Sequence, residues 1–174
     1  MALSVIIVLY VCIGLMSAAG SVSVSRKVFS AKAEQIFFGL FLVAIASFYL
    51  AFTAYFGNEG AWRLETGAVA AFAVLGVLGT RVSVLLILGY VLHGLWDLLH
   101  ELHVHAGLDF DKGAEIPLGY GAFCATYDWC LAAYFYMRRR QWTAAWEAHR
   151  DDSMLVPDQF NQTMGSELPK EENT

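Results

Sequence analysis

The stretch 91–105 reads VLHGLWDLLHELHVH and places acidic and imidazole side chains inside an apolar run. If the stretch is helical, His93, Asp97 and His100 fall within about 60° of one another, because each residue turns a helix by about 100°. A charged group at the centre of a bilayer costs roughly 2.5 to 3.5 kcal/mol, so these side chains need partners inside a bundle. The stretch therefore predicts an apolar helix with one polar stripe that faces other helices.

The rest of the chain is apolar enough to surround such a helix. Its 174 residues are 57% hydrophobic and 16% charged, with a mean hydropathy of +0.51, which is more apolar than soluble domains are. A lipid bilayer is therefore the expected partner of most of the surface. A transmembrane helix needs roughly 20 apolar residues. Five segments have this length, and they predict an all-α, five-helix transmembrane bundle over residues 1–140: 2–24, 35–57, 62–80, 82–104 and 118–137.

Lysine and arginine residues divide unevenly between the two sides of this bundle. Only Arg63 and Lys112 fall on one side, and the other nine fall on the opposite side. Because positive residues stay in the cytosol, we predict an outside N-terminus and a cytosolic C-terminus, with the bacterial cytoplasmic membrane as the location. The first segment lacks the basic start of a signal peptide, so we interpret it as a retained helix.

The residues after the fifth segment differ from the bundle in composition. In 141–150, Trp142 and Trp146 are four residues apart among basic residues, which predicts an amphipathic helix on the cytosolic surface. Residues 151–174 are acidic and poor in apolar residues, which predicts a disordered tail. The net charge of -5 is concentrated in this tail. The bundle itself is close to neutral, which argues against nucleic acid as a partner.

The fifth segment offers a partner for the polar stripe. Residues 117–128 read PLGYGAFCATYD and end in Asp128. Asp128 and His93 lie about equally far from the loop that joins their helices, so the rise of about 1.5 Å per residue places them at one depth. The third segment adds Glu65 near the same membrane face. We therefore expect three helices to direct acids and imidazoles into one region near the extracytosolic face.

Two kinds of chemistry fit such a region. Imidazole and carboxylate groups on neighbouring helices can hold a divalent metal ion, zinc or iron; the candidate ligands are His93, Asp97, His100, His103 and Asp128. Buried carboxyl groups can also act as general acids and bases; the candidates are Asp97, Asp128 and Glu101. The residues expected around a substrate are Trp96, Tyr120, Cys124, Tyr127 and Glu65.

The leading hypothesis is a metal-binding integral membrane protein, and the sequence leaves open whether it is an enzyme. One alternative is a metal-free acid/base enzyme, or a binding protein for a lipophilic small molecule, in which the aromatic residues of the second segment wall a pocket. Another is a non-catalytic accessory subunit of a larger membrane complex, where the polar groups only hold helices together. A homo-oligomer also remains open.

The strings HGLWDLLH (93–100) and PLGYGAFCATYD (117–128) resemble a family of small bacterial membrane proteins of unknown function. The resemblance covers residues 35–137. It implies that the polar residues of both strings form one site, and it implies no activity.

Two further features have structural interpretations. Glu34 stands at the start of the second segment, where an acid favours a helix N-terminus. Small residues allow helices to approach closely, which we expect at Gly14, Gly20, Gly76 and Gly79.

Overall fold

The computed structural model describes residues 2–56, 59–107 and 113–166, with side chains as far as residue 148. Over these ranges the chain is all-helical, as predicted. The five helices are α1 (Ala2–Val28), α2 (Ala31–Phe56), α3 (Trp62–Gly79), α4 (Ser83–Ala106) and α5 (Tyr120–Ser166).

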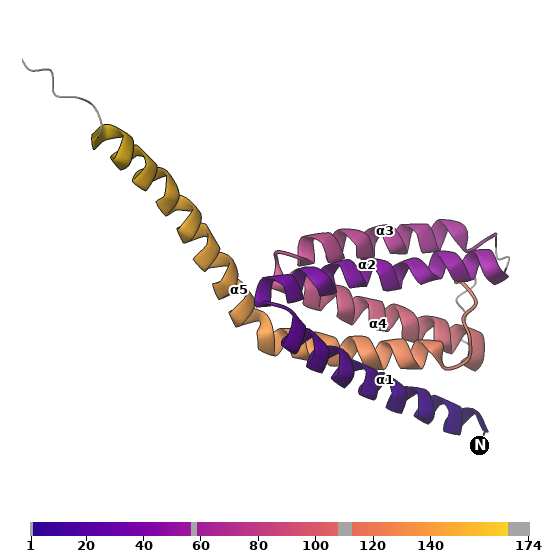
Figure 1. Ribbon diagram of the computed structural model, residues 1–174. Helices are drawn as coiled ribbons and strands as arrows, with labels where there is room; N and C mark the ends of the chain where they lie inside the picture. Colours follow the sequence, from indigo (N-terminus) through magenta and orange to yellow (C-terminus); the bar gives the residue numbers. More distant parts are fainter. Residues whose placement is uncertain (1, 57–58, 108–112, 167–174) are drawn as a thin grey trace, which may run out of the picture.

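Helices α1 to α4 are long and apolar enough to cross a membrane. At 1.5 Å per residue the 26 residues of α2 extend roughly 39 Å and the 18 residues of α3 roughly 27 Å, which compares with about 30 Å for the hydrocarbon core. Helix α5 is not among the apolar spans because tyrosines and Asp128 lower the hydropathy of its first turns. Its first part nevertheless lies beside α4 within the bundle (Figure 1). A fifth crossing therefore stays a prediction.

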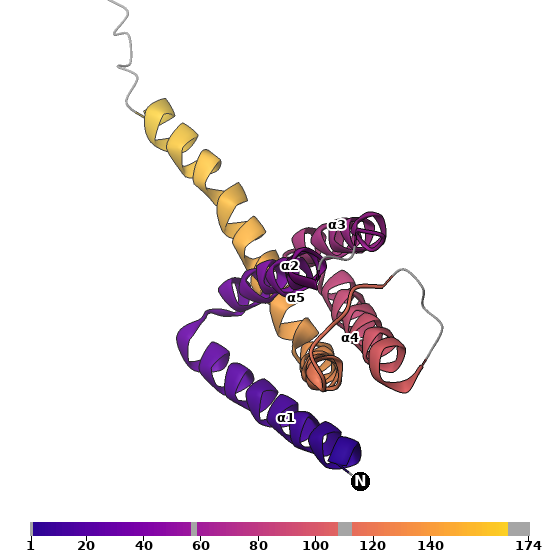
Figure 2. The same ribbon diagram turned by 90° about the vertical axis from the view of Figure 1, so that its right-hand side faces the viewer.

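Helix α5 lies between α1 on one side and the group of α2, α3 and α4 on the other. Helices α2 and α3 pack together, α4 packs between α3 and α5, and α1 packs along α5 (Figure 1). Helix α1 has little contact with α2, and Figure 2 shows the two set apart across α5. The first part of α5 therefore stands between α1 and the other helices, and it carries Asp128 into the core.

Close backbone contact fixes α2 against α3. A Cβ atom on Gly76 would lie 2.5 Å from the Gly39 carbonyl oxygen, and one on Gly39 would lie 2.6 Å from the Gly76 carbonyl oxygen. The structure confirms the expected close approach at Gly76, and also at Gly14 and Gly79. The prediction of close approach is wrong at Gly20, which has no neighbour within 4 Å of an added Cβ atom.

Helix α5 continues through the segment 141–150, where the sequence predicted a separate surface helix. Trp142 is fully buried, and the Trp146 indole donates to Gln35 of α2. These tryptophans therefore close the end of the bundle. The helix extends to Ser166 across part of the predicted disordered tail. Residues 167–174 lie outside the described residues, and their disorder stays a prediction.

Candidate metal centre

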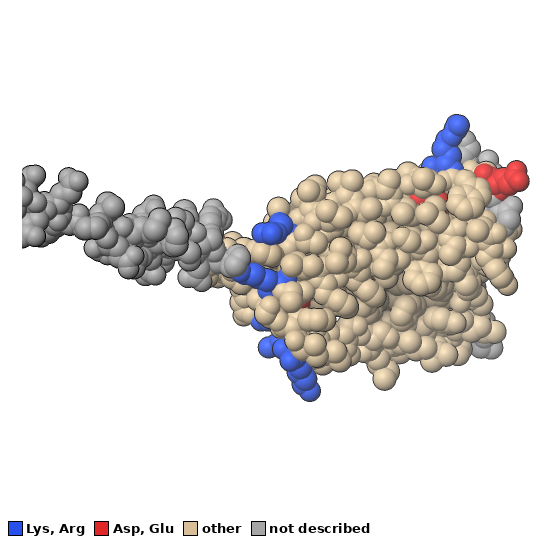
Figure 3. Space-filling view, turned by 45° about the horizontal axis from the view of Figure 1, so that its top comes forward, with Lys and Arg blue, Asp and Glu red and all other residues tan. Residues whose placement is uncertain are grey.

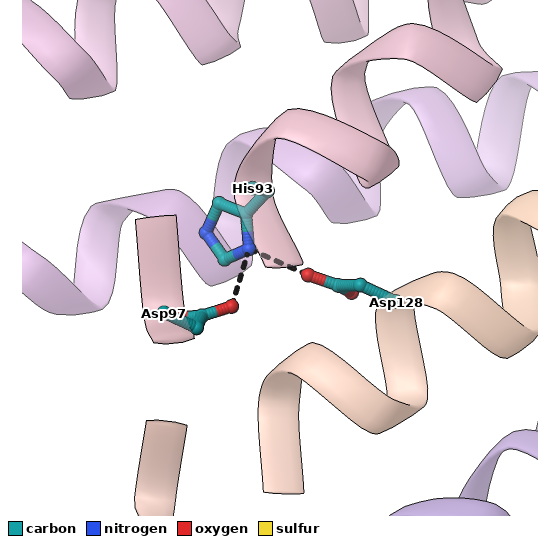
Figure 4. A group of neighbouring side chains, drawn as sticks. All are labelled: His93, Asp97 and Asp128. Atoms are coloured by element: carbon teal, nitrogen blue, oxygen red, sulfur yellow. Dashed lines mark hydrogen bonds and ion pairs between the residues drawn. The ribbon is translucent and has the colours of Figure 1, made fainter. Parts of the chain in front are cut away.

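Three side chains from α4 and α5 meet near the midpoint of α4 (Figure 4). His93 and Asp97 lie one turn apart on α4, and Asp128 points toward them from α5. His93 Nδ1 is 2.7 Å from Asp128 Oδ2 and 3.0 Å from Asp97 Oδ2. One candidate ligand atom from each residue lies within 4.8 Å of the others. The group could therefore hold a metal ion, and we call it the His–Asp–Asp group.

Aromatic residues pack against this group, and its side chains are buried. The Tyr49 hydroxyl donates to Asp97 Oδ1 over 2.6 Å. The Phe72 ring meets the His93 imidazole at an angle of 75°, with 4.9 Å between ring centroids. His93, Asp97, Asp128 and Tyr49 are each at most 1% exposed. Tyr49 was not predicted as a site residue, although its hydroxyl within an apolar segment was the available signal.

The His–Asp–Asp group has unused bonding capacity. Among the described residues, none gives a hydrogen-bond partner to His93 Nε2 or to Asp128 Oδ1, and both atoms are buried. With both aspartates ionised, a protonated His93 leaves a net charge of about -1 inside the bundle. A divalent cation beside a neutral His93 would bring that charge to about zero. The donor atoms and the charge therefore both fit a divalent metal ion.

His100 belongs to a second buried group nearer the end of α4. Its Nε2 atom is 2.9 Å from Glu65 Oε1 on α3. Its Nδ1 atom is 2.9 Å from the Trp96 carbonyl oxygen. His93 and His100 lie on the same face of α4, but their spacing of seven residues in the sequence separates them by roughly 10 Å along the helix axis. His100 thus lies outside the His–Asp–Asp group, at a different depth.

The contacts of His100 define where its protons are. A carbonyl oxygen only accepts, so Nδ1 donates to Trp96. Nε2 faces a carboxylate oxygen of Glu65, and a proton must lie between these two atoms for them to bond. Glu65 also accepts the Trp96 indole N–H over 3.3 Å and the Ala114 backbone N–H over 2.9 Å. This second group therefore ties the α4–α5 connector to α3.

Glu101 holds the start of α5. Its Oε1 atom accepts the backbone N–H of Gly119 and its Oε2 atom that of Gly121, each over 2.9 Å. The first N–H groups of a helix have no partner within the helix and favour a negative charge. The structure therefore places Glu101 at a helix end, one turn from Asp97, with both carboxylate oxygens accepting backbone N–H groups, and its role as an acid or base stays a prediction.

The other candidate residues lie beside His100, in a pocket next to Asp128, or outside both. Trp96 lies beside His100, with 5.1 Å between ring centroids. Tyr120, Cys124 and Tyr127 line a pocket together with Asp128. His103 is half-buried and lies outside the His–Asp–Asp group.

A model of a family of unknown function, DUF6010, matches residues 5–141. The match covers nearly all of α1, the whole of α2 to α4, and α5 as far as residue 141. The chain belongs to DUF6010. No curated protein and no solved structure matches the chain. The resemblance to a family of unknown function is therefore confirmed, whereas the bacterial and membrane character of DUF6010 stays a prediction.

This DUF6010 chain has another buried polar cluster at the opposite end of the bundle, around Glu34. The Glu34 carboxylate is fully buried and accepts four hydrogen bonds. The donors are Ser25 (3.1 Å), Tyr134 (2.5 Å), Arg138 Nε (2.9 Å) and Trp142 (3.0 Å). We call these five residues the Glu34 cluster. It joins α1, α2 and α5, which goes well beyond the helix-end role that the sequence analysis gave Glu34.

The sequence of this DUF6010 chain did contain a signal for the Glu34 cluster. Tyr134, Arg138, Trp142 and Trp146 are spaced four residues apart, so they share one face of α5. That face meets Glu34 and Gln35 on α2. A stripe of polar and indole side chains that continues past the predicted end of a transmembrane segment thus indicates that the helix goes on packing against its neighbours.

Proposed function

We propose that this protein is an integral membrane protein that binds one divalent metal ion, zinc or iron, through His93, Asp97 and Asp128. The observation that carries the proposal is the convergence of three buried ligand atoms from two helices within 4.8 Å. The negative charge of the group, which a divalent ion would balance, supports it. The protein has four helices of apolar, membrane-spanning length, and three of them, α2, α3 and α4, contact or supply the site.

Three protein ligands leave at least one coordination position for water or substrate. That arrangement is typical of catalytic zinc sites, whereas structural zinc sites have four protein ligands. An ion there can polarise a bound group or lower the pKa of a bound water. The proposed centre is therefore of the catalytic type.

The distribution of charge supports the proposed orientation in the membrane. Figure 3 shows basic side chains gathered at the end where α5 leaves the bundle. They include Arg26, Lys27 and Lys32. By the positive-inside rule this end faces the cytosol and the N-terminus faces outward. The metal centre then lies near mid-membrane, and Glu65 and His100 lie nearer the outer face.

Metal analysis of the detergent-purified protein tests the proposal. We expect about one equivalent of zinc or iron in the wild type and a loss of roughly tenfold or more in His93→Ala and Asp128→Ala. His103→Ala is the matched control because His103 is on the same helix but outside the group, and it should keep its metal. Circular dichroism confirms folding. Equal metal content in all four proteins, or none after incubation with zinc and with iron(II), would overturn the proposal.

A metal-free acid–base site is the second candidate. The observation that favours it is that His93 Nδ1 faces a carboxylate oxygen of both Asp97 and Asp128 at hydrogen-bond distance. One proton on Nδ1 can be shared between the two acids without any ion. Absence of metal from a folded wild type, with loss of ligand binding or turnover in Asp128→Asn, would favour this candidate.

A further inference from the structure

A pocket of about 300 Å³ between α2 and α5 reaches the His–Asp–Asp group. Its α2 side includes Phe41, Ile45 and Phe48, and its α5 side includes Phe123, Cys124 and Asp128. Phe48 is 52% exposed, so the pocket wall extends to the outer surface of the bundle. Phe41 and Phe48, two aromatic residues of α2, therefore line a pocket next to the candidate metal centre.

Asp128 connects the pocket to the centre. It is 1% exposed and lines the pocket. Its Oδ2 atom contacts His93, whereas no described residue gives its Oδ1 atom a hydrogen-bond partner. An unsatisfied buried carboxylate oxygen is costly, so a ligand that donates a hydrogen bond there would be stabilised.

The charge of the site favours a neutral hydrogen-bond donor over a cationic one. If the centre holds a divalent ion, as proposed above, the His–Asp–Asp group is close to neutral and a cationic ligand would bring an unbalanced charge into the bundle. A hydroxyl group donates a hydrogen bond without a charge. The apolar walls suit a hydrocarbon body. A neutral lipophilic alcohol or phenol therefore fits better than an ammonium compound.

The size of the space limits the part of the ligand that enters. A volume of about 300 Å³ is at the lower end for small-molecule pockets. Phe41 and Tyr127 also line a second hollow, of about 290 Å³, between α1, α2 and α5. The two hollows are thus neighbours that share two wall residues, and the first alone holds only a short part of a long chain.

We propose that the pocket between α2 and α5 binds a neutral lipophilic molecule with a hydroxyl group, taken up from the bilayer, whose hydroxyl donates to Asp128 Oδ1. The choice of a neutral ligand rests on the proposed metal-binding function. The pocket and the unpaired oxygen do not depend on that function.

Photolabelling of the wild type tests this assignment without any substitution. One probe is a long-chain alcohol with a diazirine on its chain. The other is the methyl ether of the same molecule, which cannot donate a hydrogen bond. Each compound without its diazirine serves as a competitor. We expect the alcohol to label peptides containing residues 41–48 and 120–128. A hydrogen bond to a charged group contributes about 1.5 to 3 kcal/mol, so competition by the unlabelled ether should be weaker by roughly tenfold or more.

Two matched substitutions on α2 test the location. Ile45→Trp fills the pocket and should abolish labelling by the alcohol while leaving the metal content unchanged. Ala44→Trp adds the same side chain at an exposed neighbouring position and should change neither.

The outcomes separate the two proposals. Equal labelling by alcohol and ether would mean a passive groove for hydrocarbon chains and would overturn this inference, whatever the metal content. Selective alcohol labelling of a protein without metal would support hydroxyl binding at Asp128 and overturn the metal proposal alone. Selective labelling that Ile45→Trp leaves intact would overturn the assignment to this pocket.

Discussion

His93 on α4 and Asp128 on α5 contact each other across the helix interface, with Nδ1 and Oδ2 2.7 Å apart and both side chains at most 1% exposed. If the pair only holds the helices together, its coupling energy should be modest, since such contacts average about 0.6 kcal/mol in a membrane protein. If it binds metal, added ion should stabilise the protein further, by about 2.7 kcal/mol at 100 times the dissociation constant.

The first prediction follows from that difference. Adding zinc or iron(II) to chelator-treated wild type should raise its thermal unfolding midpoint, whereas His93→Ala and Asp128→Ala should not respond. Thermal unfolding in detergent, followed by circular dichroism, measures this. A similar rise in His93→Ala would show that the ion binds elsewhere.

The second prediction concerns Glu65. Glu65→Ala removes the acceptor of His100, the Trp96 indole and the Ala114 backbone N–H. Removing one member of a buried ion pair costs about 3 kcal/mol or more. We therefore expect a loss of this size in chemical unfolding, together with altered tryptophan fluorescence, and no loss of bound metal. Glu59→Ala, at an exposed position before α3, is the control and should be close to neutral. Loss of metal in folded Glu65→Ala would place Glu65 in the centre.

The third prediction concerns the Glu34 cluster. Glu34→Ala should release the part of α5 that follows Tyr134, because Arg138 and the Trp142 indole lose their buried acceptor. A loss of about 3 kcal/mol would raise the population of the opened form on the order of 100-fold. Limited proteolysis with trypsin measures this as faster cleavage at 138–140. The exposed Glu147→Ala on the same helix should be cleaved at the wild-type rate.

The fourth prediction compares two glycines on α3. Gly76→Ala would place a Cβ atom 2.5 Å from the Gly39 carbonyl oxygen, so we expect it to push α2 from α3 and destabilise the protein by about 1 to 3 kcal/mol. Gly67 has no neighbour within 4 Å of an added Cβ atom. Gly67→Ala should therefore be neutral or stabilise by about 0.5 to 1 kcal/mol. Equal unfolding midpoints for the two variants would contradict the close contact.

The helices and the meeting of His93 with Asp128 could be predicted from sequence for simple reasons. Helix length in a bilayer is set by its thickness, and two antiparallel helices that share a loop have matched depths. These two constraints bring Asp97, His93 and Asp128 together without any knowledge of neighbouring side chains.

The partners of His100 and Glu101 could not be obtained in this way. The angle on a helix says which side chains share a face, but the next helix to meet that face is set by tertiary packing. His100 meets Glu65 of α3, and Glu101 meets the first residues of α5. Glu34 shows the same limit, since its donors come from positions 25 to 142.

Backbone hydrogen bonds help to hold the described residues before α5 and the first turn of that helix. Glu65 and Glu101 accept backbone N–H groups of Ala114, Gly119 and Gly121, and every residue except proline has such a group. These bonds do not depend on the side chains of the connector, so an exposed side chain such as Glu115 can be exchanged, whereas Ala114 and Ile116 are buried in the core. Gly119 is restricted as well, because its φ of 80° and its contact with Tyr10 exclude a side chain. Relatives should thus vary at Glu115 while they retain both glutamates and small or apolar residues at 114 and 116.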